Sequence, residues 1–194
     1  MKTLQTTQFV DAGTHFSRYI ETSRTPIKLA RTINYARILR RIKTCIKIII
    51  AGLFLSGITA FPLETELHLL ANLSGAAPEY MHSWINVVYQ GVRLSNQAYP
   101  FLSYGTDWLA FAHIMLAVLF IGPLRNPEKN IWVIEFGMIA CVAILPLAFI
   151  MGPIRGIPFF WTLVDCSFGA VGIIPLYISY ISIKKLQQLN GSGL

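Results

Sequence analysis

Four ionisable side chains lie inside long apolar stretches of the sequence: Asp107, His113, Glu135 and Asp165. A charge in hydrocarbon costs roughly 3 kcal/mol even on the lenient insertion scale, so such groups are candidates for function. A carboxylate that binds one imidazole nitrogen fixes the tautomer of the ring and raises its basicity. This chemistry suits proton transfer or the ligation of a metal or haem.

His113 and Asp165 are the two of these groups that could meet. Counted from the expected outer ends of their spans, they lie roughly 12–15 Å and roughly 10–12 Å deep. We therefore predict a ligand-binding site in which His113 faces Asp165, with Asp107 and Arg155 above them at the outer mouth. The site requires the second and fourth spans to be neighbours. The alternatives are a histidine that only holds helices together, or one that faces lipid or a partner, and no catalytic residue is assigned.

The remaining acidic groups have simpler interpretations. Glu135 follows the predicted loop that carries Arg125 and Lys129, so an ion pair at the membrane interface is expected. Outside the spans, Glu64 and His68 are one turn apart on a predicted helix, which is a spacing that could hold a metal. A solvated helix face is the favoured account of these residues and of the nearby His82, so no metal site is assigned.

The apolar stretches that carry these groups predict a membrane protein. Apolar residues make up 54% of the 194 residues, and a spanning helix needs about 20 of them in succession. The fold class is therefore all-α, a four-helix transmembrane bundle with an outer helical hairpin between the first two spans. The predicted segments are 1–45 (basic, cytoplasmic), 46–62 (first span), 63–102 (outer helices), 103–124 (second span), 125–130 (loop), 131–154 (third span), 155–157 (outer turn), 158–183 (fourth span) and 184–194 (tail).

The distribution of Lys and Arg predicts the orientation of these spans. Ten of the sixteen lie between Lys2 and Lys47, and four more fall in the loop and tail on the same side. Only Arg93 and Arg155 remain on the other side, so the positive-inside rule places both termini in the cytoplasm. We expect the inner membrane of a bacterium. The tryptophans near the predicted span ends agree with an aromatic belt: Trp108, Trp132 and Trp161.

An amphipathic helix is predicted directly before the first span. Its apolar and basic residues alternate at helical spacing, which is typical of a helix on the inner leaflet that attracts anionic lipid. A docking surface for a partner membrane protein is the alternative, and nucleic acid is not an expected partner. The first 45 residues also resemble an organelle transit peptide, although Asp11 and Glu21 argue against one. The apolar face consists of Tyr35, Ile38, Leu39, Ile42 and Ile46, and the basic face of Arg37, Arg40, Arg41 and Lys43.

Two strings of the sequence resemble those of small bacterial inner-membrane proteins of unassigned function. They are Tyr104–Trp108, followed by His113, and Arg155–Trp161, followed by Asp165–Gly169. The resemblance implies no function. In outline, four spans with an outer segment between the first two are also similar to the sterol-isomerase and sigma-2-receptor group, but none of its motifs is present.

Two classes of function are compatible with the sequence. The first is a bundle that binds a lipophilic ligand, a quinone or haem near the outer leaflet. The second is a non-catalytic accessory or assembly subunit of a larger membrane complex. A transporter ranks third, because no repeat of whole helices is visible. Whether the chain is an enzyme stays open, since it lacks a P-loop, a dinucleotide fingerprint and the common hydrolase motifs.

Overall fold

The computed structural model describes the backbone of residues 3–191 and the side chains of residues 32–190. Within this range the chain is helical and contains no strand, which confirms the all-α prediction. The α-helices are α1 (Thr3–Ala60), α2 (Leu63–Leu73), α3 (Glu79–Ala98), α4 (Tyr104–Leu119), α5 (Ile121–Arg125), α6 (Ile131–Ile154) and α7 (Phe159–Gly191), and the 3-10 helices are η1 (Ser74–Ala76) and η2 (Pro100–Ser103).

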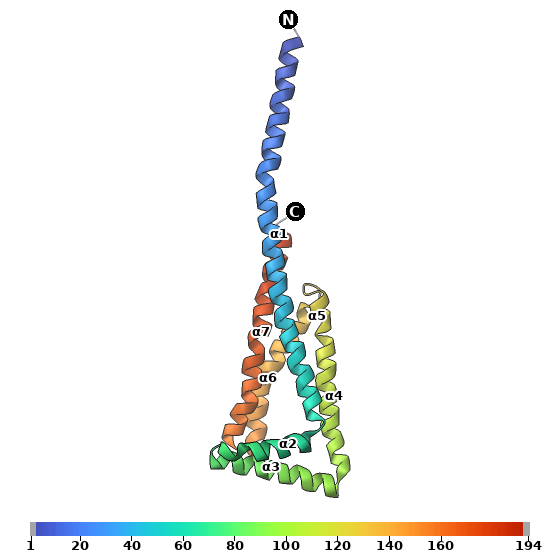
Figure 1. The fold of residues 1–194 in the computed structure, drawn as a ribbon, viewed down its shortest axis with the longest axis vertical. Helices are drawn as coiled ribbons and strands as arrows, with labels where there is room; N and C mark the ends of the chain where they lie inside the picture. The colour runs from blue at the N-terminus through green and yellow to red at the C-terminus, as the bar shows by residue number, and fades with distance from the viewer. Residues whose placement is uncertain (1–2, 192–194) are drawn as a thin grey trace.

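Four of the helical segments are long and apolar enough to cross a membrane, as predicted. They are Thr32–Ala60, Pro100–Arg125, Ile131–Ile154 and Phe159–Asn190. Most of their apolar side chains point away from the protein, which is the arrangement that a lipid solvent favours. The start of α1 and the end of α7 lie at one end of the bundle, and α2 and α3 cross the opposite end (Figure 1).

The helix α1 is one continuous element of 58 residues. The basic segment and the first span were expected to be separate, but residues 32–51 contain neither Gly nor Pro and the helix has no break there. At 1.5 Å per residue, α1 is about 87 Å long, whereas the hydrocarbon layer is about 30 Å thick. Its first half therefore projects beyond the other helices (Figure 1).

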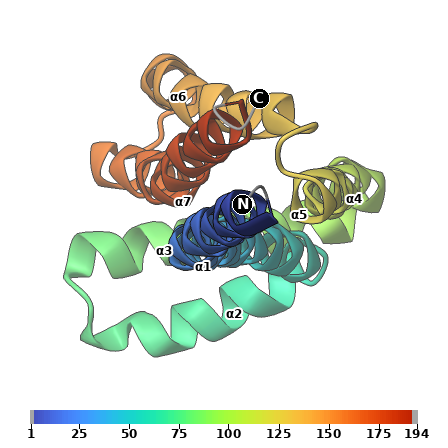
Figure 2. The same ribbon diagram turned by 90° about the horizontal axis from the view of Figure 1, so that it is seen from above.

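The bundle is built from two helix pairs, α1–α4 and α6–α7, which are joined by the contact of α1 with α7. Seen along its axis, α1 packs against α4 on one side and α7 on the other, while α6 packs on α7 (Figure 2). Each pair approaches closely at a glycine. A Cβ on Gly57 of α1 would lie 2.8 Å from the Ala110 carbonyl oxygen of α4, and one on Gly169 of α7 would lie 2.6 Å from the Cys141 carbonyl oxygen of α6. Small residues at such contacts are the usual means of packing helices in a membrane.

The best-packed part of the molecule lies toward the end that carries the termini. There the apolar stripe of α1 that was expected to face the lipid surface packs inside the protein: Ile42 and Ile46 are fully buried, and Tyr35, Ile38 and Leu39 are half-buried. It packs with the last turns of α7 and the facing ends of α4 and α6. We call this part the closed end and define it by Ile42, Ile46, Phe120, Val133, Ile134, Leu176, Ile183 and Leu186.

Candidate functional site

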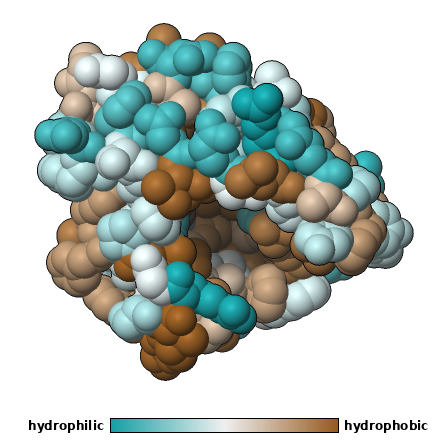
Figure 3. All heavy atoms as spheres, turned by 90° about the horizontal axis from the view of Figure 1, so that it is seen from below, coloured by the Kyte–Doolittle hydropathy of each residue, from teal (hydrophilic) through white to brown (hydrophobic). Residues whose placement is uncertain are grey.

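Toward α2 and α3 the two helix pairs separate. Phe168 and Leu186 lie 18 residues, or five turns, apart on the same line of α7. Leu186 is 0% exposed in the closed end, whereas Phe168 is 69% exposed. Figure 3, which looks from the side of α2 and α3, shows a recess near the centre of this face, bordered mainly by apolar atoms. We call this recess between the pair α1–α4 and the pair α6–α7 the hollow.

His113 lies on the flank of α4 that faces the hollow. It precedes Phe120 by seven residues, or about two turns, so the two share a stripe of α4. Phe120 reaches α6, because a Cβ on Gly137 would lie 2.9 Å from its ring. Two turns toward the hairpin end, at His113, the same stripe points between the helix pairs. His113 Nδ1 lies 2.8 Å from the Leu109 carbonyl oxygen. Since a carbonyl only accepts, Nδ1 carries the hydrogen and Nε2 remains an acceptor.

Asp165 lies on the side of α7 that packs toward α6. It precedes Leu176 by eleven residues, or about three turns, and Leu176 lies over Gly137 of α6, with its Cδ1 atom 3.1 Å from a Cβ placed there. Asp165 is half-buried, and no side chain among residues 32–190 hydrogen-bonds to it. Asp165 is therefore an ionisable group of the α6–α7 pair without a protein partner in the described range.

The predicted contact between His113 and Asp165 is not formed. In the described part of the chain, α4 and α7 are not a packed pair, because α1 packs against both and the helices diverge at this depth. The sequence placed both residues at similar depth, but depth carries no information about which helices are neighbours. The two side chains instead belong to different helix pairs, His113 to α1–α4 and Asp165 to α6–α7, and ligand binding by them stays a prediction.

Asp107 and Arg155 do not join this pair. Asp107 lies on the other flank of α4, beside α1, α2 and the end of α3. Arg155 is exposed in the turn between α6 and α7, where its backbone N–H caps α6 by bonding the Met151 carbonyl oxygen at 2.9 Å. No ion pair joins these residues within the range that the structure describes. The four residues of the predicted ligand site thus lie in separate parts of the molecule: on the two helix pairs, beside α2 and α3, and in the turn after α6.

A second cavity lies where α1, α2, α3 and α4 meet. It has a volume of about 300 Å³, and Glu64, Asn96, Ser103 and Asp107 are among its lining residues. The Ser103 hydroxyl donates to Asn96 Oδ1, and Asn96 Nδ2 donates to Glu64 Oε2 at 2.6 Å. We call the cavity that these residues line the corner cavity. The hydrogen-bond chain along its wall ties α2 to the end of α3 and to the start of α4.

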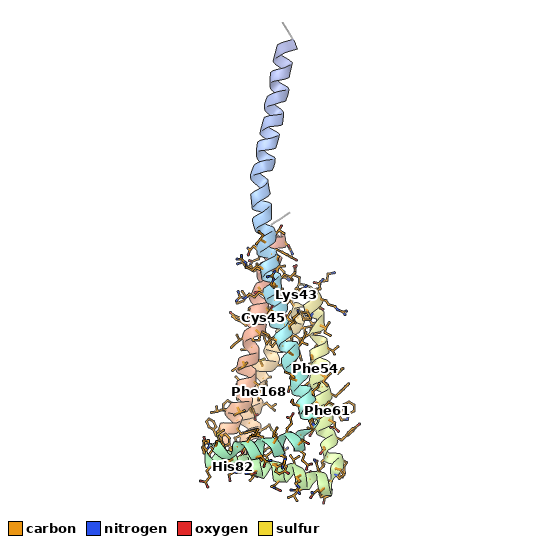
Figure 4. The ribbon with its side chains drawn as sticks, in the orientation of Figure 1. Lys43, Cys45, Phe54, Phe61, His82 and Phe168 are labelled. Atoms are coloured by element: carbon orange, nitrogen blue, oxygen red, sulfur yellow. The ribbon has the colours of Figure 1, made fainter. Side chains whose placement is uncertain are left out.

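The helices α2 and α3 form a hairpin that bridges the two helix pairs. At one tip the Tyr80 ring lies edge-on to Phe160 of α7, with 5.1 Å between centroids, and the other tip is the corner cavity. His82, labelled in Figure 4, fixes the turn of the hairpin. Its Nδ1 lies 2.8 Å from the Ser74 hydroxyl and its Nε2 lies 2.9 Å from Asn86 Nδ2. The neutral ring with hydrogen on Nδ1 satisfies both contacts, because the Ser74 hydroxyl itself donates to the Ala71 carbonyl.

The hairpin histidines are used in packing. Both ring nitrogens of His82 are occupied, and His68 stacks at an angle on Tyr89 with 5.4 Å between centroids. His68 Nε2 lies 3.3 Å from Asn72 Nδ2. Among the described residues no group of three or more His, Cys, Asp or Glu side chains could hold a metal.

The acidic residue that lies beside the cations of the α5–α6 loop is Glu128 and not the expected Glu135. No ion pair joins Glu135 to Arg125 or Lys129 in residues 32–190. Glu128 lines a cavity with both cations, and its carboxylate accepts from Asn190 Nδ2. Sequence reasoning missed Glu128, Asn96 and Ser103, because single polar residues in loops and helix ends carry no spacing signal.

Comparison with protein-family models, with curated proteins and with solved structures finds no match for this chain. The functional argument therefore rests on the arrangement of its own residues.

Proposed function

We propose that the chain is a multi-pass protein of the bacterial inner membrane with both termini in the cytoplasm. The charge distribution supports this orientation, because fourteen Lys and Arg fall on the side of the termini and two on the side of the hairpin. Accessibility of introduced cysteines tests it. Ser83→Cys on α3 should react with an impermeant maleimide on intact cells, and Gln188→Cys near the end of α7 only after permeabilisation. The reverse pattern would overturn the orientation.

We further propose that the hollow binds a lipophilic molecule with a polar head, and that an isoprenoid quinone is the class that fits best. The observation that carries this proposal is an apolar recess between two helix pairs, each of which carries one ionisable group, His113 on α4 and Asp165 on α7. His113 Nε2 can accept from a hydroquinone hydroxyl, and the Asp165 carboxyl group, when protonated, can donate to a quinone carbonyl. Apolar walls with a few placed polar groups are typical of small-molecule sites.

The hairpin supports this assignment because it borders the hollow on one side and leaves the recess open beside it (Figure 3). It is anchored on α7 through Tyr80 and on α4 through Ser103. A lipophilic molecule can therefore enter the hollow past the hairpin.

Solvent extraction of the protein, purified in mild detergent, followed by mass spectrometry tests the ligand. We expect one quinone per chain in the wild type, and loss of most of it in His113→Ala and Asp165→Asn. Asp107→Asn is the matched control, because it removes an intramembrane charge on the other flank of α4 and should retain the ligand. A Soret band in the absorption spectrum would identify the ligand as haem bound at His113 and not as a quinone. Folded wild-type protein that carries neither compound would refute ligand binding.

An accessory role is the second candidate, and the projection of α1 favours it. The N-terminal part of this helix extends beyond the other helices of the bundle (Figure 1). A partner membrane protein would bind there, or insert a helix into the hollow. Removal of residues 1–31 should then abolish stoichiometric co-purification with that partner while residues 32–190 remain folded. Unchanged co-purification would exclude α1 as the docking element.

A further inference from the structure

A second polar cavity lies at the closed end, where α1 meets the loop between α5 and α6. It has a volume of about 310 Å³ and is lined by Lys43 on α1, by Arg125 at the end of α5 and by Lys129 in the loop. Figure 4 labels Lys43. Tyr35, Asn126 and Glu128 complete its polar wall. We call it the basic pocket.

The cations of the basic pocket are not neutralised by the protein. Three cationic side chains and one carboxylate line it, which leaves a net charge of +2. No ion pair involves Lys43, Arg125 or Lys129 among residues 32–190. The carboxylate of Glu128 is held by α7, where Asn190 Nδ2 lies 3.0 Å and 3.2 Å from its two oxygens. The cations therefore remain available to an anion from outside the chain.

The loop that carries two of these cations is rigid. The Lys129 backbone N–H donates to Asn126 Oδ1 at 3.2 Å. Asn130 Nδ2 donates to the carbonyl oxygens of Asn126, at 2.9 Å, and of Gly122, at 3.2 Å. The loop geometry is thus fixed before any ligand binds, which lowers the entropic cost of binding.

The basic pocket lies at the depth of lipid headgroups. Arg125 ends one predicted span and Ile131 begins the next, so the loop is at the membrane interface. Trp132 is exposed immediately after it, which is typical of an interfacial position. A guanidinium group binds phosphate through two parallel hydrogen bonds, and ammonium groups add point charges.

We propose that the basic pocket is a specific site for the phosphate of an acidic phospholipid of the inner leaflet, held by Lys43, Arg125 and Lys129. The choice of leaflet rests on the proposed orientation of the chain, which the cysteine experiment tests separately. The pocket differs from the diffuse attraction of the N-terminal basic residues to anionic lipid, because its cations converge on one cavity. It thereby ties α1 to the α5–α6 loop through a lipid.

A titration in nonionic detergent tests this proposal, because no lipid surface then carries charge. Short-chain phosphatidylglycerol is added to the full chain and the bound lipid is counted by native mass spectrometry. We expect one saturable site per chain, weakened roughly 100-fold in the triple variant K43Q/R125Q/K129Q. Arg125→Lys keeps the positive charge but loses the guanidinium group that makes two parallel hydrogen bonds to phosphate, so it should weaken lipid binding about tenfold. This single variant tests the site even if the triple variant folds poorly.

The matched control is R37Q/R40Q/R41Q, which removes the same charge from exposed positions of α1 outside the pocket. It should change the affinity by less than about threefold, because exposed charges are screened. Equal weakening in both triple variants would show diffuse attraction and overturn the site. Equal binding of phosphatidylcholine would also overturn it. Displacement of the lipid by inorganic phosphate at the same concentration and ionic strength would assign the pocket to a soluble anion instead.

Discussion

The closed end and the hairpin end of this bundle are built from the same helices and the same kinds of residue, yet they pack differently. Ile42 and Ile46 of α1 meet Ile183 and Leu186 of α7, and all four are fully buried. Five turns away on the line of Leu186, Phe168 is exposed to the hollow. The difference does not come from hydropathy, because both ends are apolar.

The cause of the difference is the direction in which α1 leans. At the closed end α1 contacts α7, and at the hairpin end Gly57 brings it against α4. A straight helix cannot stay in contact with two neighbours that diverge, so α1 loses its contact with α7 toward the hairpin end. In a membrane the surface so uncovered meets lipid rather than water, and its exposure carries little cost. Helices that separate at one end therefore form a recess in a small bundle at little cost in stability.

The largest expected effect is a loss of stability at the closed end. Leu186→Ala deletes a fully buried side chain and should lower the free energy of unfolding by about 2 kcal/mol or more, because a cavity remains. Phe168→Ala, on the same line of α7, should cost less than about 1 kcal/mol, since its side chain has few protein neighbours to lose. Denaturation in mixed micelles measures both. Equal losses would mean that α1 and α7 stay together along their whole length and that there is no hollow.

The next effect concerns the contact that pulls α1 away from α7. In Gly57→Ala the new Cβ would lie 2.8 Å from a backbone oxygen that cannot rotate away, so the helices must move apart at a cost of about 1–3 kcal/mol. Gly52→Ala is the control, because its Cβ meets nothing within 4 Å. It should be neutral or slightly stabilising, since Ala favours helix. A Gly57→Ala variant as stable as Gly52→Ala would contradict the close α1–α4 contact.

The sequence predicted the four spans but not how they pair. The spans follow from runs of apolar residues, and the outer helices follow from amphipathic spacing within residues 63–102. Neighbours could not be predicted, because almost every face of a membrane helix is apolar and none is marked as interior. The close approach of α1 to α4 occurs at Gly57, and one glycine in an apolar run does not identify the neighbouring helix.

The candidate site shows the same limit. His113 and Asp165 were found because ionisable residues are rare in spans, and their depths were estimated from helical rise. The separation between them depends on how far the helix pairs diverge, which no local pattern encodes. The corner cavity joins Glu64 to Asn96 across 32 residues, so only the fold brings its partners together.

The smallest effect is expected at the hairpin, which connects the two helix pairs where they have separated. Asn96→Ala removes both hydrogen bonds of the chain from Ser103 to Glu64, so it should lower the free energy needed to open the hairpin by about 1–2 kcal/mol. Amide hydrogen exchange of α2 and α3 should become faster, while exchange at the closed end stays unchanged, because the two ends share no hydrogen bond. Gln97→Ala is the neighbouring control, since that side chain is exposed. If Asn96→Ala also accelerated exchange around Ile42 and Ile183, the hairpin and the closed end would open as one unit, which would contradict their separate packing.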